Sequence, residues 1–224
     1  ELLRRAVDTQ RFDPRHRDLE LRRQLGVSPA APLVIHVGRL APEKNLALVT
    51  AAFERIQALS PHARMLWVGD GPSRSALQQA HPRHLFPGIL RGETLSQHFA
   101  SADIFLFPSV TETFGNVTLE ALASGLTVCA FDYAAAKEHI VDGVSGELAP
   151  MSQGTGFVRA AERATRDWLR GKRLGVAGRR AVEGLSPPRV AADFVDLMSN
   201  VIQQKKVASH LEKNRDAALH STPV

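Results

Sequence analysis

The sequence predicts an α/β protein: a Rossmann-like parallel sheet of about six strands with helices on both faces, followed by C-terminal helices. Three observations predict this fold. Between residues 33 and 150, short apolar segments alternate with longer segments of helical periodicity, and turns containing glycine or proline separate them. The apolar segments are continuous rather than alternating, which is typical of parallel strands covered on both faces. After Pro150 only helical patterns remain.

The elements follow in a regular order. The polar, arginine-rich first 31 residues are expected to form a linker and a short helix, LELRRQLG, that ends at Gly26. Pro61 stops the helix NLALVTAAFERIQALS, and Gly125 ends the helix NVTLEALASG. Two further helices are expected in GDGPSRSALQQA and TLSQHFASA. Strands are expected at residues 33–37, 63–68, 86–91, 103–108, 126–131 and 146–150.

The chain divides into three expected parts. Residues 1–31 are the linker and short helix, residues 32–204 the Rossmann-like domain, and residues 205–224 a polar, mobile tail. The sequence begins with Glu1 rather than methionine, so we interpret it as part of a longer protein whose preceding domain the linker leaves.

Composition excludes several classes of protein. With 44% hydrophobic and 23% charged residues, the 224-residue chain can bury a core. The single cysteine, Cys129, excludes internal disulfides and is expected to be buried and inert. No apolar run approaches the ~20 residues that span a bilayer. The net charge of +5 is concentrated in residues 159–180, which carry eight basic and two acidic side chains, so a nucleic-acid partner is not supported.

Loops after the strands are expected to meet at one edge of the sheet, because right-handed crossovers place all carboxyl ends there. In the loop GRLAPEKN, Gly38 allows a tight turn, Arg39 leaves the strand, and Lys44 precedes a helix. Two cations beside a helix N-terminus favour a diphosphate site. The alternative is that both cations are ordinary solvated loop charges.

Two other loops are less specific. The loop GDGPSR resembles the start of a dinucleotide fingerprint, but Arg74 stands where a small residue is needed and Pro72 lacks a backbone donor. A tight strand-to-helix turn is the preferred interpretation. Gly88 and Gly92 in GILRGET could let a flat base approach the backbone or could be ordinary turn residues.

The loop SVTETFGNVTLEALASG contains two carboxylates around a helix start. Glu112 lies in the loop, Gly115 and Asn116 begin the helix, and Glu120 follows about one turn inside it. Backbone N–H groups of residues 115–118 suit phosphate oxygens, and the carboxylates suit sugar hydroxyls. A sugar nucleotide offers ribose, diphosphate and hexose in that order. The alternative is a favourable helix charge and a solvated loop acid.

These motifs carry a family resemblance over residues 33–150. GRLAPEKN, GDGP, ASADIFLFPSVTETFGNVTLEALASG and EHIVDGVSGELAP resemble the C-terminal, donor-binding half of retaining glycosyltransferases with two Rossmann-like domains, the GT-B type. TETFGNVTLEA followed by AFDYAAAKEHI is most similar to bacterial and plant-type lipid-directed hexosyltransferases, including GDP-mannose-dependent α-mannosyltransferases. RRAVDTQRFDP resembles the family's entering linker, with Ala6 where glycine is usual.

The resemblance implies roles for individual residues. Arg39 and Lys44 would bind the diphosphate and stabilise the leaving group, and Glu112 would contact the transferred hexose. Glu120 would hold the ribose hydroxyls, and Leu90 and Leu95 would pack the base. The full implied donor-binding set is Gly38, Arg39, Lys44, Leu90, Leu95, Glu112, Phe114, Gly115, Asn116, Val117 and Glu120. No cofactor or metal is expected, because no Asp-x-Asp pair or histidine ligand spacing occurs and cations can replace the metal.

The resulting hypothesis is the donor-binding half of a retaining hexosyltransferase, with GDP-mannose favoured and a UDP-hexose next, acting on a lipid or glycan. The fragment is expected to be inactive without its N-terminal, acceptor-binding domain. A non-catalytic module that binds nucleotides or sugar phosphates is the alternative, and GRLAPEKN disfavours a sugar-nucleotide epimerase. The expected location is cytoplasmic, with peripheral attachment to the inner face of the membrane as an option.

Two further features need interpretation. Arg159, Arg163, Arg166, Arg170 and Arg173 recur at helical spacing, which predicts one arginine face on a single helix. We interpret this face as solvated, with binding to anionic lipid headgroups as the alternative. His36 lies in the first strand and is expected to be a satisfied core histidine rather than a catalytic one.

Overall fold

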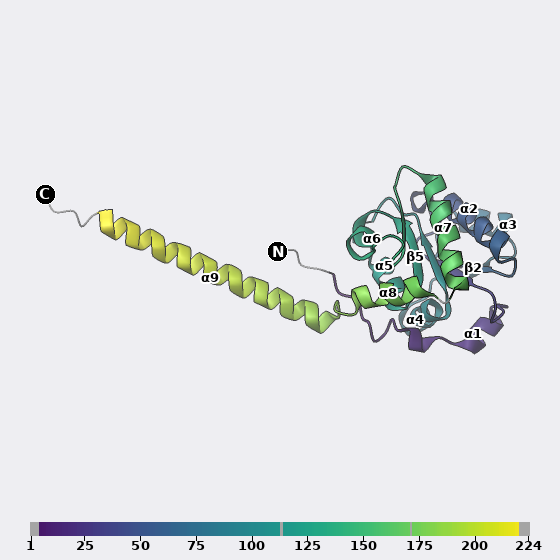
Figure 1. Ribbon diagram of the computed structural model, residues 1–224, viewed down its shortest axis with the longest axis horizontal. Helices are drawn as coiled ribbons and strands as arrows, with labels where there is room; N and C mark the ends of the chain where they lie inside the picture. The colour runs from purple at the N-terminus through teal and green to yellow at the C-terminus, as the bar shows by residue number, and fades with distance from the viewer. Residues whose placement is uncertain (1–4, 113, 171, 220–224) are drawn as a thin grey trace. The chain divides into compact units, whose positions relative to one another are not determined.

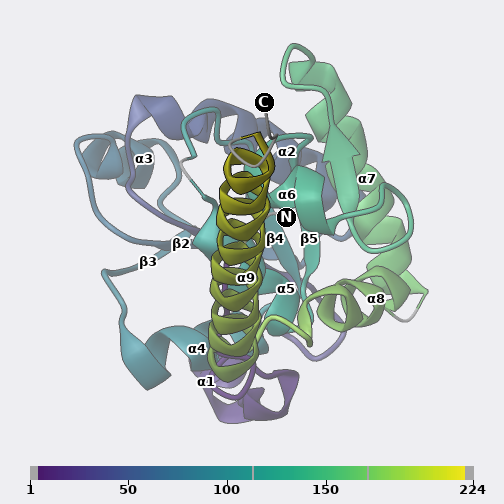
Figure 2. The same cartoon turned by 90° about the vertical axis from the view of Figure 1, so that its left-hand side faces the viewer.

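The fold is a six-stranded, fully parallel sheet with strand order β3-β2-β1-β4-β5-β6. Figure 2 labels the strands β3, β2, β4 and β5 of this sheet. It was analysed in a computed structural model that describes residues 5–112, 114–170 and 172–219, with side chains to residue 205. The beginning of the expected linker, Thr113, Gly171 and the end of the expected tail therefore lie outside the described residues. The strands are β1 (Leu33–Val37), β2 (Arg64–Val68), β3 (Leu85–Gly88), β4 (Ile104–Phe107), β5 (Thr127–Phe131) and β6 (Glu147–Ala149). The expected α/β fold is confirmed.

Helices connect the strands in the expected order. They are α1 (Leu19–Gln24), α2 (Leu46–Leu59), α3 (Arg74–Ala80), α4 (Gly92–Ser101), α5 (Asn116–Ala123), α6 (Ala134–His139), α7 (Gly154–Leu169), α8 (Arg173–Val182) and α9 (Pro187–Leu219), with short 3-10 turns η1 (Pro14–His16) and η2 (Pro42–Lys44). The bounds follow local chemistry: α2 ends just before Pro61, and a left-handed Gly115 (φ 77°) precedes α5.

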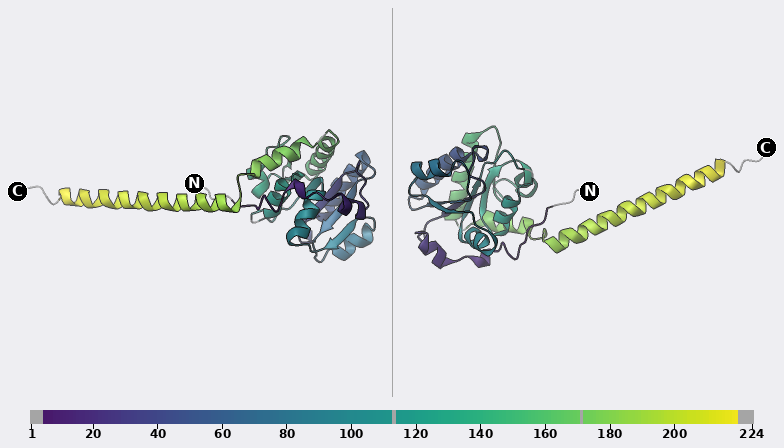
Figure 3. Two further views of the ribbon diagram at one scale, coloured as in Figure 1. Left: turned by 90° about the horizontal axis from the view of Figure 1, so that it is seen from below. Right: turned by 180° about the vertical axis from the view of Figure 1, so that it is seen from behind.

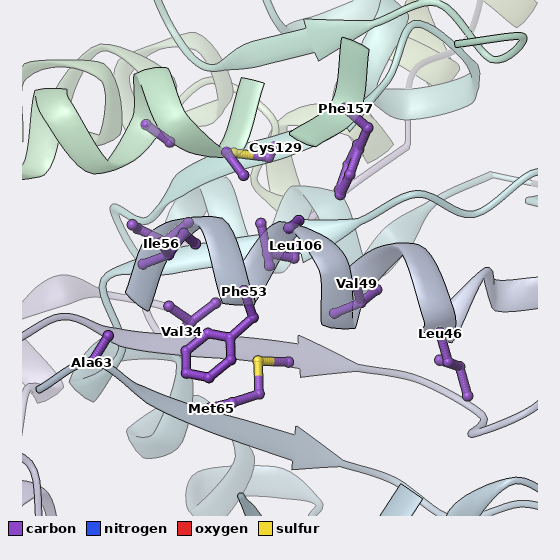
Figure 4. Packing of buried hydrophobic residues seen from close by; sticks show 14 of the residues in the cluster. Val34, Leu46, Val49, Phe53, Ile56, Ala63, Met65, Leu106, Cys129 and Phe157 are labelled. Carbon is purple, nitrogen blue, oxygen red and sulfur yellow. The ribbon is translucent and has the colours of Figure 1, made fainter. Parts of the chain in front are cut away.

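Helices α2 and α7 cover one face of the sheet (Figure 1). Phe53 of α2 lies over Val34 of β1 and Met65 of β2, and Phe157 of α7 packs near Cys129 of β5 (Figure 4). All five side chains are almost completely buried, as the continuous apolar strands predicted. Burial raises the pKa of the Cys129 thiol, which therefore stays protonated as expected.

Helices α4, α5 and α8 lie over the opposite face. Phe99 of α4 meets Phe105 of β4 edge to face, with ring centroids 5.9 Å apart, and also meets Phe12 of the N-terminal segment. Leu119 and Leu122 of α5 are buried on this side. Two apolar layers therefore hold the sheet, and its strand ends carry the loops on a rigid frame.

The segment expected as a linker is anchored to the body from Val7 onward. Asp103, at the start of β4, is fully buried and accepts hydrogen bonds from Arg22 of α1 (2.9 Å), from Arg17 (2.9 Å) and from Lys172. It also accepts the Leu33 N–H at 2.8 Å. One buried carboxylate thus joins the N-terminal segment, two strands and the α7–α8 turn at the amino-terminal edge of the sheet.

The prediction that the five arginines lie on a single helix is wrong, because α7 ends at Leu169 and Arg173 begins α8. Arg163 pairs with Glu147 and Asp142, and Arg166 pairs with Glu162 at 2.8 Å. These pairs occupy part of the arginine face with protein carboxylates. They favour the interpretation of a solvated, internally paired surface over a lipid-binding one.

Contact density divides the chain into a body, residues 7–184, and a second unit formed by residues 1–6 and 185–224. The second unit contains α9, which is one continuous helix (Figure 3). The boundary expected at residue 204 falls inside this helix, and the expected polar tail is helical up to Leu219. Within the described residues, no helix has the length and apolar character needed to cross a membrane.

Candidate functional site

The strand order reverses between β1 and β4. From β1 the chain proceeds outward to β2 and β3, and it then returns to β4 on the other side of β1. In open parallel sheets, ligands bind outside the carboxyl ends of the strands at this reversal. The loop after β1 (residues 38–45) and the loop after β4 (residues 108–115) flank that position. Both were selected from sequence as parts of the site.

Lys44 and Glu112 meet at the reversal point. Lys44 Nζ donates to Glu112 Oε1 and to Ser109 Oγ (3.1 Å), and Ser109 Oγ donates to the same carboxylate oxygen at 2.8 Å. The two charged side chains are only 15% and 16% exposed. Lys44 Nζ also lies 5.6 Å from the centre of the Phe107 ring. The structure therefore brings together two of the three residues expected to be catalytic.

Hydrogen bonds from side chains to backbone carbonyls hold the two loops in place. Asn45 adopts a left-handed conformation (φ 52°), and its Nδ2 donates to Pro108 O at 2.8 Å. Tyr133 Oη donates to Glu112 O at 3.2 Å. Sequence reasoning missed Asn45, Ser109 and Tyr133, although all three lie inside motifs that it quoted. Residues far apart in the chain thus fix the positions of Lys44 and Glu112.

The GDGP loop packs closely against the loop that follows β1. A Cβ on Gly69 would lie 1.9 Å from Gly38 O, and one on Gly71 would lie 2.4 Å from Leu40 O. Leu40 N–H in turn donates to Asp70 O at 2.9 Å. These glycines are needed because two backbones pass close together, which agrees with the interpretation of GDGP as a tight turn.

Helix α5 begins between the two carboxylates. Gly115 is buried at the N-cap, and a Cβ there would lie 3.0 Å from Ala135 Cβ. Thr118 N already donates to Gly115 O at 2.9 Å, so the N–H groups of residues 116 and 117 are the ones that precede the first helical hydrogen bond. Of the four backbone donors expected at residues 115–118, the Thr118 N–H is therefore already used within the helix. Such groups still favour an anion.

Glu120 lies in the second turn of α5, with Arg11 as its charged neighbour. Burial raises the pKa of the Glu120 carboxyl to about 7, and the positive charge of Arg11 acts in the opposite direction. Arg11 was assigned to the linker and not to the site. A hollow of about 380 Å³ is lined by Arg11, His16, Glu93, Ser96 and Gln97, beside the α4 turn that carries Leu95.

The remaining expected residues are distributed around these two groups. Arg39 is exposed on the same loop as Lys44, and Phe114 is half exposed before α5. Leu90 after β3 and Leu95 on α4 are half-buried. Gly38 N–H donates to Val68 O at 3.0 Å and so belongs to the sheet edge. The structure unites Lys44 with Glu112, and Glu120 with Arg11; the binding role of each residue stays a prediction.

His36 lies beneath the Lys44 loop and is fully buried. One ring nitrogen, Nδ1, is 2.9 Å from Leu106 O, whereas Nε2 has no hydrogen-bond partner. Burial lowers the pKa of His36 to about 4, and Leu106 only partly opposes this. The imidazole is therefore neutral, with Nδ1–H donating to Leu106 O. It is a core histidine as expected, but only one of its nitrogens is satisfied.

The described residues contain no group of three or more His, Cys, Asp or Glu side chains arranged to hold a metal ion. The polar groups of the site are instead the ammonium of Lys44, two carboxylates and a helix N-terminus.

The sequence matches the model of the family described as "Glycosyl transferases group 1" over residues 31–167. The chain belongs to the group 1 glycosyltransferases. It is 37% identical over 192 residues to the GDP-mannose-dependent alpha-mannosyltransferase of Mycobacterium tuberculosis, an alignment that covers 85% of this chain and 48% of that protein. It is 42% identical over 132 residues to the sulfoquinovosyl transferase SQD2 of Arabidopsis thaliana, covering 58% of this chain and 25% of that protein.

The fold of this glycosyltransferase chain agrees with a solved relative. Sucrose-phosphate synthase from Thermosynechococcus elongatus superposes with a TM-score of 0.74 and 26% identity, covering 91% of this chain and 53% of the other. The expected resemblance to one half of a GT-B glycosyltransferase is thereby confirmed. The chain spans about half, or less, of the length of the curated relatives it matches.

Proposed function

We propose that this chain is the donor-binding half of a retaining hexosyltransferase that uses a nucleotide-diphosphate sugar. GDP-mannose is the favoured donor, and a UDP-hexose is the next candidate. The observation that carries the proposal is the Lys44–Ser109–Glu112 contact at the strand reversal, where a cation and a carboxylate are held side by side. A mannosyltransferase relative at 37% identity supports the choice of donor.

In this proposal Lys44 and Arg39 stabilise the negative charge of the leaving nucleoside diphosphate. When the hexose C1–O bond breaks, its electron pair goes to the β-phosphate oxygen, and negative charge grows on the diphosphate. Lys44 Nζ already points toward a carboxylate oxygen of Glu112 and can donate to a phosphate oxygen, while exposed Arg39 adds a second cation from the same loop. The N–H groups at the start of α5 add neutral donors. Fixed donors of this kind each contribute roughly 2.7–4 kcal/mol to catalysis.

The two carboxylates have different partners in the donor. Glu112, beside Lys44, would accept hydrogen bonds from hexose hydroxyls. Glu120, half-buried beside Arg11, would accept those of the ribose. A buried carboxylate binds selectively to ligands that supply hydrogen-bond donor groups, since an unpaired buried charge costs several kcal/mol. The order hexose, diphosphate, ribose then runs from the β4 loop into α5.

The base would lie toward α4. The hollow of about 380 Å³ between the N-terminal segment and α4 contains Arg11, the neighbour of Glu120, and polar side chains such as Gln97. Leu90 and Leu95 are half-buried near this side of the sheet and supply apolar surface. A nucleoside held by Glu120 can extend into this hollow, which supports the inclusion of both leucines in the set.

We propose that the anomeric configuration of the hexose is retained because the acceptor attacks from the same face of the ring that the diphosphate leaves. The acceptor hydroxyl oxygen bonds to C1, and its proton passes to the departing phosphate oxygen. The acceptor, a lipid or glycan, would be held by the part of the relatives that this chain does not span. The chain on its own is therefore expected to bind the donor without transferring the hexose.

Calorimetric titration with GDP, UDP and ADP tests the proposal. We expect GDP to bind with a micromolar Kd and UDP more weakly. Lys205→Met, on α9, serves as a charge-matched control for Lys44→Met because Lys205 is exposed and lies outside the body. If none of the three nucleotides binds at millimolar concentration, the site is not a nucleotide site.

A thermal-shift comparison of GDP-mannose with UDP-glucose then chooses the donor, because a ligand that binds the native state raises the apparent melting temperature. A larger shift with UDP-glucose would replace mannose with glucose in the proposal. Product analysis with a longer form of the protein that includes the acceptor-binding part would separate a transferase from a non-catalytic binding module.

A further inference from the structure

A second cavity lies at the amino-terminal edge of the sheet, the edge opposite the Lys44–Glu112 loops. Its volume is about 570 Å³, and it is enclosed by the C-terminal half of α2, the start of β2, the turn between α3 and β3 and the turn after α1. The proposed donor site uses none of these segments. Cavities of 300–1,000 Å³ are the usual size for small-molecule sites.

The lining of this cavity is strongly basic. It contains His62, Arg64, His81, Arg83 and His84, whereas Glu54 is its single carboxylate. Arg22 and Arg163, elsewhere in the body, have carboxylate partners. Among the described residues, by contrast, neither Arg64 nor Arg83 forms an ion pair. The cavity therefore gathers positive charge that the protein itself does not neutralise.

Arg64 gives an independent sign of a missing partner. It is the first residue of β2, and its Nε is buried without a hydrogen-bond acceptor. A buried donor that lacks an acceptor destabilises the folded state, and does so more strongly when the group is charged. Because this Nε is closed to solvent, an anion in the cavity can supply the acceptor when the half-buried Arg64 side chain turns toward it.

His84 is oriented for donation. Trp67 Nε1 donates to His84 Nδ1 at 3.1 Å, so the proton of the neutral imidazole is on Nε2. His81 stacks on His84 with centroids 4.7 Å apart, and Phe53 meets it edge to face at 5.0 Å. Burial lowers the pKa of His84 to about 4, and the charges of His81, Arg64 and Arg83 add to this. These groups are thus close enough to repel one another.

We propose that this cavity is a second ligand site, specific for a phosphate group borne by a small molecule, and that Arg64, Arg83 and His84 are its donors. Guanidinium groups recognise tetrahedral oxyanions with two parallel hydrogen bonds, and a neutral Nε2–H adds a third contact. The volume exceeds what one phosphate ion fills, so the natural ligand is a phosphate monoester with an organic part. Glu54 at the rim is available to that part's hydroxyl groups.

Histidine-selective NMR on the whole chain tests this site directly. The Lys44→Met variant is titrated with inorganic phosphate at constant ionic strength, so that the donor site does not contribute. We expect the imidazole signals of His81 and His84, assigned with single His→Asn variants, to shift and saturate at millimolar phosphate. Arg83→Gln should weaken the apparent affinity by about fivefold or more, because exposed Arg83 can be replaced without disturbing the core.

Arg159→Gln is the matched control, since it removes the same charge from an exposed helix position outside the cavity. Equal affinity in Arg83→Gln and Arg159→Gln would overturn the proposal, as would shifts that follow ionic strength and do not saturate. Glycerol 3-phosphate and vesicles containing phosphatidic acid separate the sources of the phosphate. Saturation by the soluble ester identifies a metabolite, and Arg83-dependent co-sedimentation with the vesicles identifies a lipid headgroup.

Discussion

Replacement of Lys44 by methionine separates the structural role of its ammonium from the proposed binding role. In the free protein Lys44 Nζ contacts Glu112 Oε1 and Ser109 Oγ, and both charged side chains are mostly buried. Methionine keeps much of the apolar stem of lysine and removes the charge and its hydrogen bonds. Glu112 then retains the Ser109 hydroxyl, which still donates at 2.8 Å.

The expected magnitudes differ for folding and for binding. Loss of one partner of a mostly buried pair that keeps one hydrogen bond should lower the free energy of unfolding by about 1–3 kcal/mol. A charge-assisted hydrogen bond to phosphate contributes about 1.5–3 kcal/mol, which corresponds to roughly 10–150-fold in Kd for GDP. The double variant Lys44→Met/Glu112→Gln should recover stability, because no uncompensated carboxylate remains, but it should not recover GDP binding.

Calorimetry with GDP and urea unfolding measure these two effects in the same four proteins. Glu112→Gln alone should bind GDP more tightly than the parent protein, since a carboxylate beside the diphosphate is removed, and should lose affinity for the intact hexose donor. A folded Lys44→Met protein whose Kd for GDP lies within twofold of the parent value would refute the assignment of Lys44 to the diphosphate.

Three further outcomes are expected. Burial raises the pKa of the Glu120 carboxyl to about 7 in the free protein, and the proposed contact with the ribose hydroxyls needs the ionised form. GDP affinity should therefore rise between pH 6 and 8, and Glu120→Gln should lose this rise in calorimetry. Gly69→Ala should cost about 3 kcal/mol or more in urea unfolding, since its Cβ would meet Gly38 O, whereas Gly143→Ala, with φ 70° and open space, should cost only about 1–2 kcal/mol. Asp103→Asn should lower the unfolding free energy by about 3–5 kcal/mol, because three cations around a fully buried position lose their carboxylate; a change below 1 kcal/mol would contradict this account.

The strands and helices of the body could be predicted because their signals are local. Segments such as LVIHV and TVCAF are apolar at four of their five positions, and each forms a fully buried strand. The break between α7 and α8 could not be predicted from the arginine spacing. The 4-3-4-3 pattern continues through the break, while the chain turns at Lys172, which adopts a left-handed conformation (φ 60°) and contacts buried Asp103. The tertiary contact between Lys172 and Asp103 thus decided where the helix breaks, against the helical spacing of the arginines.

The site divides in the same way. Lys44 and Glu112 could be proposed from their positions after β1 and β4, because parallel strands bring their carboxyl ends to one edge. Arg11 could not, since its place beside Glu120 depends on how the N-terminal segment packs against the body. The unpaired state of Arg64 is equally invisible in the sequence, where it is one of many arginines beside an apolar strand.

The sequence by itself determined the parallel α/β fold, the family and the loops that meet at the strand reversal. These follow from residue type, period and chain order, which act over short distances. Only the tertiary structure decided which charges are neighbours, which are buried and which lack a partner. Those properties arise when segments distant in the chain exclude water from one another, so that the pKa of Glu120 and the open donor on Arg64 exist only in the folded protein.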